Sequence, residues 1–273
     1  MEINKLYNES NLDTMARMQD CFVDLTVTSP PYDNQRDYKD DVGKQWSFET
    51  SKPIIKELFR VTKQGGVVVW VVNDATIDGS ETGTSFKQAL WFMECGFKLH
   101  DTMIWNKTSI PKSHKRYEQS FEYMFVFVKG NLSTFNPIKI KVKNVGKKHT
   151  RGHAEITATS HPSSASAGVY KNPGWQYKDQ KIADNIFRYS VGHNQTSKDS
   201  FVFEHPAPFP EKLAADHIKS WSNEGDLIYD PFGGSGTTAK MARLLKRNWI
   251  ASEISKEYCE IHKQRLEFYD LFN

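Results

Sequence analysis

Near the carboxyl end of the chain, the sequence reads Leu227-Ile228-Tyr229-Asp230-Pro231-Phe232-Gly233-Gly234-Ser235-Gly236-Thr237-Thr238. Four residues typical of a strand end in an acid, a glycine-rich turn follows, and Thr237–Arg247 has the spacing of a helix. Glycine lets the backbone turn tightly and approach a ligand closely, and the first turn of a helix offers free N–H groups. These residues therefore predict a ligand-binding turn between a strand and a helix.

A second acid stands where a nucleoside-containing ligand would need it. Glu253 ends the next apolar run, Trp249–Glu253, about 20 residues after Gly233, which is the place where doubly wound folds bind ribose hydroxyls. The glycines alone could also form a tight turn that binds no ligand. Here, however, a strand, a glycine-rich loop, a helix, a second strand and an acid occur in the order that favours a bound nucleoside. The loop lacks the Gly-Lys-Ser/Thr ending of a P-loop, so we expect a nucleoside-containing cofactor other than ATP or GTP.

Strand and helix patterns alternate along most of the chain. We expect strands at Asp24–Thr28, Val67–Val72, Leu99–Trp105, Tyr123–Lys129, Leu227–Asp230 and Trp249–Glu253. Helices are expected at Pro53–Val61, Ser85–Cys95, Pro210–Trp221, Thr237–Arg247 and Lys256–Tyr269. Gly65-Gly66 is expected to end the first of these helices before the next strand begins. Such alternation predicts an α/β fold with a mostly parallel central sheet.

Charge is distributed unevenly in this chain of net charge +3. Lys129–Ser200 holds 12 Lys and Arg against 4 Asp and Glu, whereas the other residues hold 24 against 29. A solvated insertion and a binding surface for a polyanion such as DNA explain this equally well. Periodicity also fades in this stretch, so we expect an insertion at residues 130–200 between two halves of one domain, residues 1–129 and 201–273.

Composition excludes several classes of protein. Mean hydropathy is −0.62, and apolar runs such as Val67–Val72 are far shorter than the roughly 20 residues of a membrane span. The first residues show no secretory signal. Cys21, Cys95 and Cys259 are too few and too widely spaced for a disulfide framework or a cysteine zinc site. We therefore expect a cytoplasmic protein without a membrane contact or a metal.

A proline-rich turn follows the first predicted strand. The chain reads Thr28-Ser29-Pro30-Pro31-Tyr32, and two prolines cannot continue a central strand. A small polar residue before Pro-Pro and an aromatic residue after it would bracket a planar ring that carries an amine. For this pentapeptide alone, a proline-rich loop with a packed tyrosine is the default interpretation.

Together, the two turns resemble the amino-directed DNA methyltransferases that use S-adenosylmethionine. His205-Pro206-Ala207-Pro208-Phe209-Pro210-Glu211-Lys212-Leu213 is similar to the cofactor-side motif of this family, and Ile104-Trp105-Asn106-Lys107 and Phe121-Glu122-Tyr123 resemble its later catalytic strands. The order of catalytic loop, variable region and cofactor loop is that of the β class. The resemblance implies a Rossmann-like methyltransferase fold in which the basic insertion recognises the DNA target.

The resemblance also assigns roles to individual residues. It implies that the cofactor is bound by Asp13, His205, Phe209, Asp230, Phe232, Gly233, Gly234, Gly236, Thr237 and Glu253, and the target base by Ser29, Pro30, Pro31 and Tyr32. Asp13 has helix capping as its alternative. Asp74, after a buried strand, would accept a proton or orient the amine, with the start of a turn as an equal alternative. The DNA-binding candidates are Lys139, Lys141, Lys143, Lys147, Lys148 and Arg151.

The chemistry that these residues suit is methylation of an exocyclic amine. Ser29 and the Pro30 carbonyl would accept hydrogen bonds from the amine, and Tyr32 would stack on a base flipped out of the duplex. C5-cytosine methylation is excluded, because its Pro-Cys nucleophile does not occur here. Within the family, Ser before Pro-Pro-Tyr is typical of N4-cytosine enzymes and Asp or Asn of N6-adenine enzymes, so we expect N4-cytosine, with N6-adenine as the alternative.

The partners that the resemblance implies are double-stranded DNA and, in a restriction-modification or host/phage modification system, a cognate restriction endonuclease. The protein would be a nucleoid-associated monomer or homodimer. A non-catalytic DNA-binding module is the rival class, and methylation of RNA or of a protein amide is a third. The aromatic residues of the basic insertion, such as Trp175 and Phe187, favour a nucleic acid.

Overall fold

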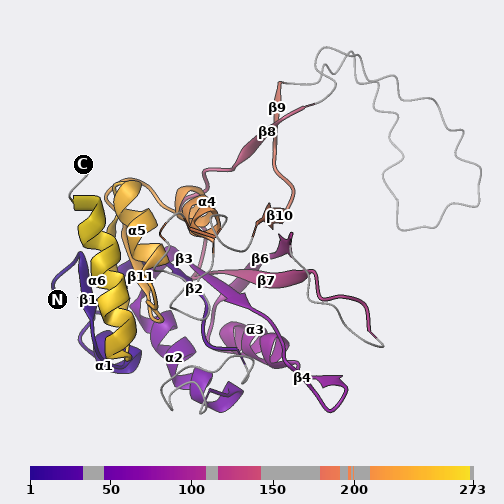
Figure 1. The fold of residues 1–273 in the computed structure, drawn as a ribbon, viewed down its shortest axis with the longest axis horizontal. Helices are drawn as coiled ribbons and strands as arrows, with labels where there is room; N and C mark the ends of the chain where they lie inside the picture. The colour runs from indigo at the N-terminus through magenta and orange to yellow at the C-terminus, as the bar shows by residue number, and fades with distance from the viewer. Residues whose placement is uncertain are drawn as a thin grey trace, which may run out of the picture. The chain divides into compact units, whose positions relative to one another are not determined.

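A computed structural model describes residues 1–32, 46–108, 116–142, 179–190, 196–197, 199 and 210–270 of the chain (Figure 1). The chain divides into two compact units: a larger one of Met1–Asn136 and Asp184–Asn273, and a smaller one of Pro137–Ala183. Among the predicted site residues, His205, Phe209, Lys143, Lys147, Lys148 and Arg151 lie outside the described residues. The larger unit holds both turns singled out in the sequence.

The larger unit is built on one sheet of eight strands in the order β1-β12-β11-β2-β3-β7-β6-β10. Their bounds are β1 Lys5–Tyr7, β2 Val23–Thr28, β3 Thr62–Val72, β6 Lys98–Lys107, β7 Phe121–Val128, β10 Ile186–Tyr189, β11 Leu227–Asp230 and β12 Asn248–Ser252. Only β7 runs antiparallel to its neighbours, β3 and β6. The expected α/β fold with a mostly parallel sheet is confirmed.

Helices cover both faces of this sheet. They are α1 Asn11–Ala16, α2 Phe48–Val61, α3 Thr84–Glu94, α4 Glu211–Trp221, α5 Thr237–Leu244 and α6 Lys256–Asp270. Alternate residues of β3 explain the two layers: Val67, Val69 and Val71 pack in one core with α4 and α5, whereas Val68 and Trp70 pack in the other with α1, α2 and α3. Among the described residues, no helix is long and apolar enough to cross a membrane.

The prediction that Gly65-Gly66 separates a helix from the next strand was wrong in detail. Helix α2 ends at Val61, and β3 begins at Thr62 and runs through both glycines. A Cβ on Gly66 would lie 2.9 Å from the carbonyl oxygen of Asp24 on the neighbouring strand, where the register between β2 and β3 shifts. The glycine therefore lets two strands approach closely at a bulge.

Short elements complete the two units. Strand β1, helix α1 and the small hairpin of β4 Thr76–Ile77 and β5 Ser80–Glu81 were not expected, because each is short and has no clear period. Strand β10 was not expected because it lies in the stretch where the periodicity fades. In the smaller unit, β8 Lys139–Lys141 pairs antiparallel with β9 Gln180–Ile182. Lys139 and Lys141 are exposed, and alternation along the strand places both on the same face of this ribbon.

Candidate active site at the carboxyl edge of the sheet

The glycine-rich loop and the proline-rich loop leave the sheet side by side. Strands β11 and β2 are parallel neighbours, so Asp230 and Thr28 end at the same edge. The buried carboxylate of Asp230 accepts hydrogen bonds from the Thr28 hydroxyl at 2.6 Å and from the Phe232 amide at 3.0 Å. Burial raises the pKa of Asp230 to about 6. Asp230, at the start of the glycine-rich loop, is thereby fixed to β2, the strand that leads into the proline-rich loop.

The glycines of the loop permit a close approach to the neighbouring elements. Gly236 has a φ of 81°, and a Cβ there would lie 2.8 Å from the ring of His262 on α6. The Gly233 amide donates to the Ser252 carbonyl at 2.8 Å. Burial, helped by the nearby Arg265, lowers the pKa of His262 to about 3, so the ring beneath the loop is neutral. Phe232 packs edge-on against Trp70 at a centroid distance of 6.1 Å.

Glu253 closes the other side of the loop. Its Oε2 accepts from the Gly234 amide and its Oε1 from the Ser255 amide, both at 2.8 Å. Burial raises the pKa of this carboxyl above its ordinary value. The Ile254 amide contributes a further hydrogen bond. Since a carboxylate can accept about four hydrogen bonds, it retains the capacity for another one. The group is therefore held in place and can still bind a hydroxyl group.

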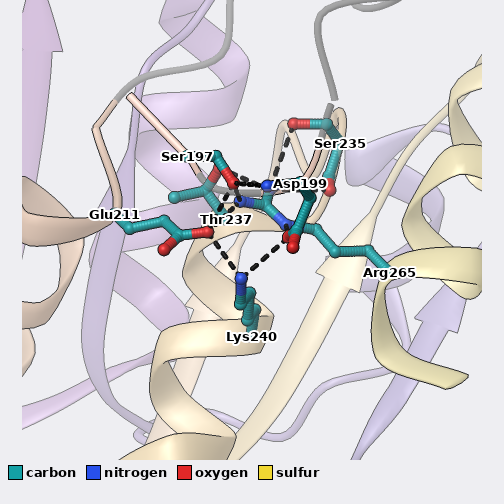
Figure 2. A network of polar contacts seen from close by, with 7 residues as sticks. All are labelled: Ser197, Asp199, Glu211, Ser235, Thr237, Lys240 and Arg265. Carbon is teal, nitrogen blue, oxygen red and sulfur yellow. Dashed lines mark hydrogen bonds and ion pairs between the residues drawn. The ribbon is translucent and has the colours of Figure 1, made fainter. Parts of the chain in front are cut away.

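A buried network of two cations and two carboxylates supports the glycine-rich loop and the start of α5 (Figure 2). Arg265 is fully buried and donates to the Ser235 carbonyl at 3.0 Å and to the Thr237 hydroxyl at 2.9 Å. The side chains that complete the network are Ser197, Asp199, Glu211 and Lys240. Burial alone would raise the pKa of Asp199, but Lys240 and Arg265 outweigh it and hold that pKa below its ordinary value.

The proline-rich loop is held through its tyrosine. The Ser29 hydroxyl lies 3.0 Å from the Tyr32 hydroxyl, which donates to Oε2 of Glu122 at 2.5 Å. Oε1 of the same carboxylate pairs with the Lys107 ammonium at 2.5 Å. Lys107 ends β6 and Glu122 is the second residue of the antiparallel β7, so both lie at the edge where β2 ends. Pro30 is buried beside them, and Pro31 and Tyr32 are half-buried.

Asp74 and Asp13 have local contacts. The Asp74 carboxylate accepts from the Ser85 amide at 2.8 Å, from the Ser85 hydroxyl at 2.5 Å and from the Thr82 hydroxyl at 3.3 Å. It therefore holds the first turn of α3, which corresponds to the turn interpretation, and its role toward an amine stays a prediction. Asp13 is exposed in the first turn of α1, where Ser10 is the capping residue. Its place near a cofactor also stays a prediction.

Several residues of this edge have roles that were not predicted from the sequence. Glu122 is the single charged residue of an otherwise uncharged strand, Phe121–Val128, which is a signal that could have been used. Asn11 donates from its side chain to the Pro231 carbonyl at 3.1 Å, and Thr28 binds Asp230. Asn at the start of a helix and Thr in a strand are both common, so neither residue type indicated these contacts.

Comparison with known proteins identifies the family. Residues 23–264 match the family described as DNA methylase. The chain belongs to this family. The predicted resemblance to amino-directed DNA methyltransferases is thereby confirmed, and S-adenosylmethionine is the methyl donor of this class. The match favours an enzyme over a non-catalytic DNA-binding module.

Individual relatives extend over nearly the whole chain. The orphan methyltransferase M.BamHII of Bacillus amyloliquefaciens is 52% identical over 254 residues, which cover 92% of this chain and 91% of the relative. The DNA adenine methyltransferase YhdJ of Escherichia coli (strain K12) is 26% identical and covers 90% of this chain and 76% of its own length. The family thus leaves open which base is modified.

Solved structures share the fold. The PvuII DNA methyltransferase, which is cytosine-N4-specific, has a TM-score of 0.68 at 19% identity and covers 95% of this chain and 84% of its own. The complex of M1.HpyAVI with S-adenosylmethionine has a TM-score of 0.58 at 20% identity and covers 96% of this chain and 97% of its own. Together with the strand order, they establish the Rossmann-like methyltransferase fold.

Proposed function

We propose that the chain transfers a methyl group from S-adenosylmethionine to the exocyclic N4 amine of cytosine in double-stranded DNA. The observation that carries this proposal is the position of Ser29. Its neutral hydroxyl stands at the end of β2, next to the strand that leads into the glycine-rich loop. In the family that the chain resembles, serine before Pro-Pro-Tyr accompanies N4-cytosine chemistry, and the PvuII enzyme bears the name of an N4-cytosine enzyme.

The residues around the glycine-rich loop fit such a cofactor. Glu253 is held in place by backbone amides, and its carboxylate can accept a further hydrogen bond from a ribose hydroxyl. Asp230 lies between the two loops, where a carboxylate would attract a cationic ligand. We assign Asp230, Phe232, Gly233, Gly234, Gly236, Thr237 and Glu253 to the cofactor, and we retain Asp13, His205 and Phe209 as candidates.

The transfer itself needs alignment more than acid or base strength. As the nitrogen–carbon bond forms, the carbon–sulfur bond breaks, the sulfur keeps the electron pair, and the nitrogen then releases one proton to water. Ser29 and the Pro30 carbonyl accept from the amine and favour its tetrahedral form. Tyr32 stacks on the flipped base, and Pro30 and Pro31 keep the loop rigid. The residues therefore act mainly by positioning the amine.

Cofactor binding should depend on pH through Asp230. Burial holds its pKa at about 6 in the free protein, and a cationic ligand beside it favours the ionised form. Binding therefore releases a proton when the pH is below 6, and affinity falls by about tenfold for each further pH unit. Calorimetric titration between pH 5 and 8 should show this decline in the wild type and a flat profile in Asp230→Asn. If the affinity of both proteins for the cofactor depends equally on pH, Asp230 does not bind the cofactor.

The basic insertion, residues 130–200, is proposed to bind the DNA target. Its candidates are Lys139, Lys141, Lys143, Lys147, Lys148 and Arg151. Lys139 and Lys141 support this, because both are exposed on one face of the β8–β9 ribbon. A surface of this charge binds phosphates by releasing counterions.

The lysine pair gives a quantitative test of this surface. The double variant Lys139→Ala/Lys141→Ala should reduce the salt slope of DNA binding by about two units, one for each lost phosphate contact, and leave cofactor affinity unchanged. The slope is measured by fluorescence anisotropy at salt concentrations between about 50 and 200 mM. Lys246→Ala, at an exposed lysine of the larger unit, is the matched control. An unchanged slope in the double variant would make these lysines a solvated face only.

N6-adenine methylation is the second candidate function, supported by the similarity to the DNA adenine methyltransferase YhdJ. Sequencing the modified bases of a host that expresses the chain tests both candidates and reports the sequence context. We expect N4-methylcytosine in one short context, with a smaller fraction of these sites methylated in a host that expresses Ser29→Ala. N6-methyladenine in one context would establish the second candidate instead.

The proposed activity does not depend on a restriction endonuclease. The relative with 52% identity is named an orphan methyltransferase, which supports modification without a partner nuclease. We therefore propose that the chain methylates DNA by itself, and that a cognate endonuclease is an additional partner only where one is encoded.

A further inference from the structure

Glu122 carries a buried carboxylate, and the free energy lost on removing this group from water must be offset by specific partners. Its side chain is 4% exposed and that of Lys107 is 16% exposed. Removing a carboxylate from water costs several kcal/mol unless it is paired and hydrogen-bonded. The Lys107 ammonium meets one oxygen at 2.5 Å, and the Tyr32 hydroxyl meets the other at 2.5 Å. The pair is therefore tied to the proline-rich loop through Tyr32.

This arrangement fixes the direction of two hydroxyl protons. An ionised carboxylate only accepts hydrogen bonds, so the proton of Tyr32 points to Glu122. The Tyr32 oxygen then accepts from Ser29, whose hydroxyl lies 3.0 Å away. Since Ser29 has one hydroxyl proton, and that proton points to Tyr32, its lone pairs are left to face other donors.

We infer that Glu122, held by Lys107, is a positioning residue that makes Ser29 a hydrogen-bond acceptor toward the exocyclic amine. The inference rests on the proposed function, in which Ser29 accepts from that amine. Without Glu122, the Tyr32 hydroxyl could donate to Ser29 instead, and Ser29 could then turn its own proton toward the amine. The acceptor would be present in only part of the molecules, and hydrogen bonds in such a chain also strengthen one another.

Three variants test the chain of contacts. Tyr32→Phe removes the hydroxyl and keeps the ring that stacks on the base, Glu122→Gln removes the charge, and the double variant removes both. We expect each to lower the single-turnover methylation rate by about tenfold, a smaller effect than the loss of a direct transition-state contact. The dissociation constants for duplex DNA and for S-adenosylmethionine should stay at the wild-type values, since a positioning role affects the transfer step.

Non-additivity is the decisive readout. Because both changes interrupt the same chain, the double variant should be no slower than either single variant. A combined effect of about a hundredfold, the product of two independent losses, would contradict the inference. Wild-type rates in Tyr32→Phe and Glu122→Gln would contradict it as well.

Folding is controlled in two ways. Tyr32→Phe leaves the Glu122–Lys107 pair intact, so it stays informative if Glu122→Gln unfolds, and Glu122→Gln/Lys107→Met removes both charges together. Tyr189→Phe is the matched control: its backbone lies opposite Lys107 in the sheet, but its hydroxyl contacts a different carboxylate, that of Asp216 on α4, at 3.2 Å. This control should methylate at the wild-type rate.

Ser29→Ala separates the inference from the proposed function. If Ser29→Ala is slow while the Tyr32 and Glu122 variants are as fast as the wild type, only the positioning role is overturned. If Ser29→Ala is itself as fast as the wild type, the proposed role of Ser29 fails.

Discussion

Arg265→Met is expected to lower the free energy of unfolding by about 3–5 kcal/mol, because it removes one of the two cations of the buried network and leaves Lys240 as the single charge partner of two carboxylates. Arg265 is fully buried and contacts Asp199 at 3.1 Å and Glu211 at 2.6 Å. It also donates to Ser235 and Thr237, so the loss reaches the glycine-rich loop and the start of α5 (Figure 2). We therefore expect weaker cofactor binding together with the lower stability. Denaturation in urea, monitored by circular dichroism, measures the first effect.

A surface residue of the same helix supplies the control for Arg265. Lys263 pairs with Glu260 at 2.8 Å, and both side chains are more than half exposed. Lys263→Met should therefore change the free energy of unfolding by less than about 1 kcal/mol. Equal effects of the two substitutions would mean that the buried network contributes no more than a surface ion pair does.

Ser29→Ala is expected to lower the single-turnover rate by about tenfold to a thousandfold, on the order of what one well-placed hydrogen bond contributes in a transition state. Binding of DNA and of the cofactor should stay nearly unchanged, because the contact strengthens as the amine becomes tetrahedral. Rapid quenching with saturating DNA and S-adenosylmethionine isolates this step. Tyr32→Ala should also weaken DNA binding, since a stacking surface is worth about 1–3 kcal/mol.

The control for Ser29 is a serine hydroxyl at the opposite end of the sheet. Ser133 donates to the Gly65 carbonyl at 2.9 Å, near the beginning of β3. Ser133→Ala should methylate at the wild-type rate. A Ser29→Ala protein that does the same would leave the Pro30 carbonyl as the main acceptor and would remove the serine argument for cytosine.

Most of the larger unit could be predicted because its signals are local. The run Leu227–Asp230 is a strand with the predicted bounds, and α3, predicted at Ser85–Cys95, lies at Thr84–Glu94. A buried strand and an amphipathic helix each carry their periodicity within a few residues. Strand β1 and helix α1 escaped prediction because they are too short for that, and β1 is ordered by pairing with β12, far along the chain.

The sequence motifs indicated the two loops of the candidate site, but not the distant residues that hold these loops in place. Asp230, Ser29 and Glu253 stand in motifs whose spacing is visible in the sequence. Tyr32 and Glu122 are 90 positions apart, and Arg265 and Asp199 are 66 apart. Such pairs depend on how strands and helices are arranged in space, which local periodicity does not contain. Asp74 shows the converse difficulty: its carboxylate holds a helix, a local use that the sequence could not distinguish from chemistry.

The identity of the methylated base tests the account most directly. Unmethylated DNA is incubated with the purified chain and with S-adenosylmethionine labelled in its methyl group, then digested to nucleosides and separated by chromatography with mass spectrometry. We predict that the label appears in N4-methyldeoxycytidine, and that it appears there about tenfold to a thousandfold more slowly with Ser29→Ala. Label in N6-methyldeoxyadenosine or in 5-methyldeoxycytidine, or unlabelled DNA from a protein that binds the cofactor, would contradict the account.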